Sequence, residues 1–147
     1  MVELFGKKQT MTFNGSATTT SNGLGIVLSC EDGDTMPLSF KLGFSCSNNA
    51  IQYEAYLTGL AISLSMGVKP MRVLRDSNIV VSQVKGDFTL REQSLTAYRT
   101  SAQKVEQKFQ TFSVEYAQRS ENKFADALAT LGSQMPFKGK RYFDKGK

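Results

Sequence analysis

Histidine is absent from the 147 residues of this chain, and cysteine occurs only twice, at Cys30 and Cys46. The lack of histidine excludes a His-ligated metal, a Ser-His or Cys-His nucleophile and any acid–base step through an imidazole. Two cysteines are too few for a disulfide framework or a structural zinc site, so we expect free thiols. No apolar run approaches the roughly 20 residues that span a bilayer, and the first residues lack the apolar stretch of a secretory signal. We therefore expect an intracellular protein, cytoplasmic or nuclear, with no membrane association.

Hydrophobic residues make up 40% of the chain and charged residues 21%, which is typical of one compact domain with a real core. The formal net charge is +5, but residues 138–147 contain five Lys/Arg and one Asp and so carry +4 of it. Such a tail can attract polyanions through counterion release, or it can simply keep the chain soluble. We divide the chain into an extension (1–9), a globular domain (10–133) and a basic tail (134–147).

The first third of the chain shows the alternating pattern of β-strands. Apolar residues alternate or cluster at 10–13, 24–28 and 36–42, and turn-forming residues separate these runs. We expect Asn14-Gly15-Ser16 to break the first strand and residues 17–22 to form a turn. Three strands so close in sequence favour an antiparallel meander.

The rest of the chain alternates between helical and strand patterns. Apolar spacing and capping residues predict helices at 48–67, 77–86, 95–109 and 120–132, with Asn48 or Asn49 capping the first and Gly67 and Gly132 ending the first and last. Short strands are predicted at 71–74 and 112–116. Each of these strands is reached through helices, so both should lie parallel to the first strand through right-handed crossovers. In the last helix we expect Phe124, Leu128 and Leu131 to face the core.

Four polar side chains are expected at the edge where parallel strands end, which is where ligands collect in such sheets. They are Asn14, Gln52, Asp76 and Asp126. Four carboxylates at these positions would form a two-metal site, in which Mg²⁺ ions clamp a phosphodiester. Two of the four are carboxamides, which are neutral and therefore weaker ligands for a hard cation.

At these residues the chain resembles the ribonuclease H domain of gypsy-type plant retrotransposons. The matching blocks are FNGSA (13–17), CSNNAIQYEAYLTGLAISLSMGV (46–68), VLRDSNIVVSQVKGDF (73–88) and VEYAQRSENKFADALATL (114–131). The resemblance implies an α/β, ribonuclease H-like fold over residues 10–133. It implies a five-stranded mixed sheet in the order 3-2-1-4-5, flanked by helices.

The resemblance also implies an activity and a set of site residues. The family cleaves the RNA strand of RNA–DNA hybrids with two Mg²⁺ ions on an Asp-Glu-Asp-Asp set. Its first Asp falls on Asn14 and its Glu on Gln52, while its later acids fall on Asp76 and Asp126. Tyr116 stands where the family often has a histidine. A turn role for Asn14 and a helix-capping role for Asp76 stay open beside these assignments.

Four further residues are candidates for nucleic-acid contact. Asn48 and Asn49 match family positions that contact the RNA minor groove and its 2′-hydroxyl groups, with helix capping as the structural alternative. Ser77 and Asn78 are candidates on the same surface.

Because Asn14 and Gln52 stand where the family has two acids, we predict a domain that binds nucleic acid but cleaves it little or not at all. Asp76 and Asp126 are left to hold one weakly bound ion or none. No neighbouring acid replaces the lost ones: Glu54 lies about 200° round the helix from Gln52, Asp32 and Asp34 belong to a distant turn, and Glu121 has no support.

Several alternatives remain open from the sequence. The domain can be a protein-interaction module on the same fold, a nuclease with residual one-metal activity, or an active enzyme disabled by design. Because the motifs around the acids are also off-pattern, we favour natural loss over engineering. Any binding of RNA–DNA hybrid is expected to be weak.

Overall fold

The computed structural model describes residues 8–18, 20–44, 47–75, 93–116 and 119–135. Within these ranges the elements, in chain order, are β1 (Gln9–Ala17), β2 (Asn22–Cys30), β3 (Thr35–Leu42), α1 (Asn48–Ser65), β4 (Pro70–Arg75), α3 (Gln93–Glu106), β5 (Thr111–Tyr116) and α4 (Arg119–Gln134). The helix predicted at 77–86 lies outside the described residues. None of the described helices is long and apolar enough to cross a membrane.

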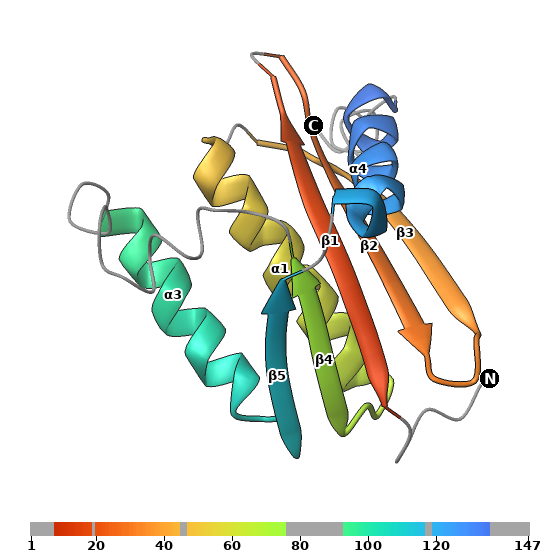
Figure 1. Ribbon diagram of the computed structural model, residues 1–147. Helices are drawn as coiled ribbons and strands as arrows, with labels where there is room; N and C mark the ends of the chain where they lie inside the picture. Colours follow the sequence, from red (N-terminus) through yellow and green to blue (C-terminus); the bar gives the residue numbers. More distant parts are fainter. Residues whose placement is uncertain (1–7, 19, 45–46, 76–92, 117–118, 136–147) are drawn as a thin grey trace, which may run out of the picture.

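The strands form one mixed sheet in the order β3-β2-β1-β4-β5 (Figure 1). The β1–β2 and β2–β3 pairs are antiparallel, while β4 pairs parallel with both β1 and β5. The predicted meander, the two parallel strands and the strand order are therefore confirmed.

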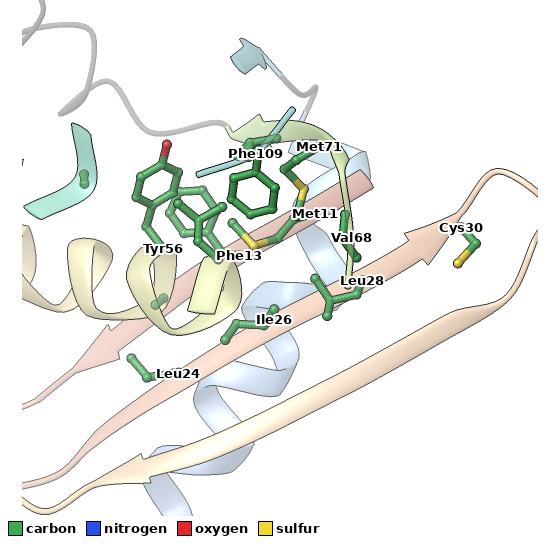
Figure 2. Packing of buried hydrophobic residues seen from close by; sticks show 14 of the residues in the cluster. Met11, Phe13, Leu24, Ile26, Leu28, Cys30, Tyr56, Val68, Met71 and Phe109 are labelled. Carbon is green, nitrogen blue, oxygen red and sulfur yellow. The ribbon is translucent and has the colours of Figure 1, made fainter. Parts of the chain in front are cut away.

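The main core lies between the sheet and α1. Met11 and Phe13 of β1, Ile26 and Leu28 of β2 and Leu60 of α1 are all buried. Figure 2 shows Met11, Phe13, Ile26 and Leu28 pointing to the same side of the sheet as Tyr56 of α1. In β1 these residues alternate with polar neighbours, whereas β2 is an apolar run that is buried on both faces.

The opposite face of the sheet is covered by α4, which packs through small residues. A Cβ atom at Gly25 of β2 would lie 2.0 Å from the carbonyl oxygen of Ala125, and one at Gly23 would lie 2.1 Å from that of Ala129. Only glycine lets the helix backbone lie this close to the strand.

The expectation that the large apolar residues of α4 face the core is wrong for Phe124 and Leu131, while Leu128 is half-buried against Gly25 of β2. Phe124 is 50% exposed and Leu131 is 52% exposed, because the small-residue face is the one that fits against the β2 glycines. Gly132 does not end the helix, which continues to Gln134. Instead a Cβ atom at Gly132 would lie 2.2 Å from the carbonyl oxygen of Phe40, so this glycine serves close packing against β3.

Two other predicted element ends differ from the structure. β1 does not break at Asn14-Gly15-Ser16, because its pairing with β2 continues to Ala17 opposite Asn22. The N-cap of α1 is Ser47, whose hydroxyl oxygen accepts a hydrogen bond from the Ala50 backbone at 3.1 Å, so neither Asn48 nor Asn49 is the cap. The predicted end at Gly67 is close: α1 ends at Ser65, and Gly67 follows with a φ of +81°.

Tyrosine–glutamate hydrogen bonds join α1 to α3. The Tyr56 hydroxyl donates to Glu106, and the Tyr98 hydroxyl donates to Glu54 at 2.5 Å. Tyr98 also stacks on Tyr53, with ring centroids 5.6 Å apart. Burial first, and the hydrogen bond to Glu106 second, raise the pKa of Tyr56 far above its usual value.

This raised pKa predicts a loss of stability in alkaline solution. A tyrosine whose pKa is higher in the folded state stabilises the fold below the unfolded-state pKa of about 10, and this contribution declines as the pH rises beyond it. We expect the free energy of unfolding to decline above about pH 10 and to decline less steeply in Tyr56→Phe. Chemical denaturation at a series of alkaline pH values measures both slopes; equal slopes would contradict the assignment.

Candidate functional site

Three of the four predicted site residues meet in one hydrogen-bonded chain. The Asn14 amide nitrogen donates to Asp126 Oδ1 at 2.8 Å, and the Gln52 amide nitrogen donates to Asn14 Oδ1 at 2.9 Å. The Gln52 amide also lies 3.3 Å from the Gly15 carbonyl oxygen, which accepts a second bond. We call Gln52, Asn14 and Asp126 the amide clamp, because they join α1, β1 and α4.

Local backbone features place these three side chains together. Asn14 is paired with Gly25, the glycine over which Ala125 of α4 lies, so the next helix residue, Asp126, comes close to Asn14. On the α1 side, a Cβ atom at Gly15 would lie 2.8 Å from Ile51, so this glycine admits the first turn of α1. Asn14 is not at the end of β1 as predicted. It lies just past Thr12, where the parallel pairing with β4 stops.

The direction of the hydrogen bonds follows from Asp126. An ionised carboxylate only accepts hydrogen bonds, so Asn14 must turn its amide nitrogen toward it. The Asn14 oxygen then faces Gln52, which can satisfy it only with its own amide nitrogen. Asn14 and Gln52 are half-buried, whereas Asp126 is exposed.

The residues of the amide clamp do not fit a pair of Mg²⁺ ions. Among the described residues, no three or more His, Cys, Asp or Glu side chains gather as a metal-binding group. The amide clamp has one carboxylate, and its amide hydrogens point at the oxygens that would otherwise face a cation. Hard divalent cations need several oxygen ligands, and two such ions side by side need several carboxylates to offset their charge.

Of the five other candidate residues, the structure describes two. Asp76, Ser77 and Asn78 lie outside the described residues. Asn48 and Asn49 are the first two residues of α1, with Asn48 exposed and Asn49 half-buried.

The nearby acids do not complete the site. Glu54 accepts the hydrogen bond of Tyr98 from α3, and so faces away from Asn14 as expected. Asp32 and Asp34 lie in the β2–β3 turn, beyond the Cys30 end of β2, which pairs with Gln9 at the far end of β1. The side chain of Glu121 is not among those described.

Sequence reasoning missed Asn122, a buried residue one helical turn before Asp126. It is 1% exposed, and within the part of the chain that the structure describes neither of its side-chain polar atoms has a hydrogen-bond partner. Buried amides are normally paired, so Asn122 is an unusual feature of this face of α4. Asn122 lies inside the matching block at 114–131, four residues before Asp126, but nothing in that block singled it out.

The fold and the clustered positions define a ribonuclease H-like domain. The chain belongs to the reverse transcriptase-like family, which it matches over residues 12–132.

Two relatives are similar in sequence. A bifunctional protein of Mycobacterium tuberculosis is 29% identical over 108 residues, which cover 73% of this chain and 30% of that protein. Ribonuclease HI of Halobacterium salinarum is 29% identical over 99 residues, covering 67% of this chain and 46% of the enzyme. The chain thus spans less than half the length of these relatives.

Solved structures share the fold. Ribonuclease H1 of Halobacterium salinarum has a TM-score of 0.77 at 24% identity, covering 85% of this chain and 96% of the other. The N-terminal ribonuclease H domain of the Mycobacterium tuberculosis protein has a TM-score of 0.74 at 25% identity, covering 86% and 94%. LC11 ribonuclease H1 in complex with an RNA/DNA hybrid has a TM-score of 0.72 at 22% identity, covering 85% and 96%.

Proposed function

We propose that this domain binds RNA–DNA hybrids and cleaves them slowly or not at all. The amide clamp is the observation that carries the proposal: two of its three polar side chains are neutral amides bonded to one another and to Asp126. Support for hybrid binding comes from the family, and from a neighbour of the same fold solved with an RNA/DNA hybrid. The finer assignment to a gypsy-type plant retrotransposon stays a prediction.

Loss of charge at the site is the physical reason for slow cleavage. Phosphodiester cleavage of this kind relies on cations that offset charge developing on the phosphate, and such terms amount to several kcal/mol. Asn14 and Gln52 supply no charge to hold those cations. In this proposal Asp126, with Asp76 as its partner, retains at most one weakly bound ion.

Hybrid binding and cleavage can be tested in a single titration with Mg²⁺ and Mn²⁺. We expect salt-dependent retention of a labelled hybrid and little product with either ion. Rapid cleavage by the full chain would contradict the proposal.

Deleting the basic tail tests where the binding comes from. Because residues 138–147 carry +4, deleting them should reduce the slope of log K against log salt by about three to four, at ~0.9 per phosphate neutralised in duplex DNA. An unchanged slope would instead assign recognition to the folded surface, including Asn48 and Asn49.

A protein-interaction module is the second candidate function. The observation in its favour is the outward face of α4, where Phe124 and Leu131 each expose about half of their surface. Exposed large apolar side chains that lie on one helix face are typical of contact surfaces. A chain that fails to retain hybrid at low salt would favour this candidate.

A further inference from the structure

The amide clamp joins elements that lie on opposite faces of the sheet. Gln52 comes from α1 on one face, Asp126 from α4 on the other, and Asn14 from β1 between them. Its bonds therefore connect the two helices through the central strand. Elsewhere on α4, the side chains of Ser39 and Lys41 donate to backbone carbonyl oxygens of the helix and so link it to β3.

The same positions filled with acids would behave in the opposite way. Ionised Asp at position 14 and Glu at position 52 have no hydrogens to donate, so carboxylate oxygens would face one another where the distances are now 2.8 and 2.9 Å. Like charges this close repel, and cations or bound protons must separate them. The Gln52 replacement would also turn an oxygen toward the Gly15 carbonyl, which now accepts a bond at 3.3 Å.

We propose that the two carboxamides take the structural place of divalent cations in this chain. Each amide donates a hydrogen to an oxygen that carboxylates at these positions would leave without a donor, and the bond to Asp126 is strengthened by its charge. The domain consequently holds α1, β1 and α4 together without metal, and its stability does not depend on Mg²⁺. This inference concerns the fold alone, so it holds whether or not the domain binds nucleic acid.

Thermal unfolding in chelator and in millimolar Mg²⁺ tests the proposal. The unsubstituted chain is compared with the double variant Asn14→Asp, Gln52→Glu. The matched control is Gln103→Glu, Gln107→Glu, which makes the same charge change at exposed positions on and just after α3.

The unsubstituted chain and the control should show the same small response of Tm to Mg²⁺. The double variant should unfold at least about 5 °C lower than the control in chelator, and Mg²⁺ should restore much of that loss in a saturable way. If the double variant does not fold, the single variant Gln52→Glu gives the same comparison with a smaller shift.

Two outcomes overturn the proposal. One is a double variant that is as stable as the control in chelator, because the amide hydrogens would then contribute nothing. The other is an unsubstituted chain whose Tm rises with Mg²⁺ as much as that of the double variant. Neither outcome depends on hybrid binding, so failure here is distinguishable from failure of the proposed function.

Discussion

Replacing Gly25 with alanine is expected to destabilise the domain by about 3 kcal/mol. The added Cβ would lie 2.0 Å from the carbonyl oxygen of Ala125 and 2.5 Å from the backbone nitrogen of Ala129. Both neighbours are helix backbone, so relief requires α4 to move away from β2 as a whole. The same movement should carry Asp126 away from Asn14. Denaturant unfolding measures the loss.

Gly59 offers a matched control within the same domain. A Cβ atom there would lie 2.3 Å from the sulfur of Met11, which is the flexible part of an unbranched side chain and can shift. Alanine also favours the helix by about 0.5–1 kcal/mol over glycine. We expect Gly59→Ala to change the free energy of unfolding by no more than about 1 kcal/mol. Equal losses for the two variants would refute the close packing of α4 on β2.

Restoring the acids should increase hybrid cleavage at least about 100-fold over the unsubstituted chain in saturating Mg²⁺. The variant is Asn14→Asp with Gln52→Glu, which returns one charge beside Asp126 and a second beside position 14. Gel analysis of a labelled RNA–DNA hybrid measures the rate. The expected gain reflects the large contribution of charge stabilisation to phosphodiester cleavage.

The control for this gain is the triple variant that also carries Asp126→Asn. It keeps a side chain of the same shape but removes one of the charges, so most of the gain should disappear. A double variant that folds, binds hybrid and still does not cleave it would show that these positions are not the centre of the reaction.

The sheet could be predicted because its signals are local. Alternation placed the strands near Met11 and Leu38, an apolar run placed the strand at Ile26, and helical connections fixed β4 and β5 as parallel. The position of the break in β1 could not be predicted. Asn14-Gly15 is a common turn dipeptide, and only pairing with β2 shows that the strand continues.

The facing of α4 was mispredicted for a different reason. Phe124, Leu128 and Leu131 form the stronger apolar stripe, and nothing within the helix indicates that Ala125 and Ala129 face the sheet. The decisive residues, Gly23 and Gly25, belong to β2, about 100 positions earlier in the sequence. The apolar pattern of a helix does not show how closely a neighbouring strand allows that helix to pack.

The four candidate positions were predicted to lie together, but the hydrogen bonds between the three that the structure describes were not predicted. Motif spacing brought Asn14, Gln52 and Asp126 to one place, and the structure puts them in contact. The sequence reading treated the two amides as lost ligands. The hydrogen bond between the two amides depends on the distance between their side-chain atoms, which the spacing of motifs in the sequence does not give.

Asn14 and Asp126 lie far apart in the sequence, and this distance affects the order in which the domain folds during biosynthesis. The two residues are 112 positions apart, while the β1–β2–β3 meander closes through short turns. Local pairings form early because they close small loops, whereas distant ones wait for the chain between them. During translation the meander can therefore pair while α4 is still unmade. Until Asp126 emerges from the ribosome, the half-buried Asn14 has no acceptor from α4, and the face of β2 that α4 covers at Gly23 and Gly25 is exposed to solvent.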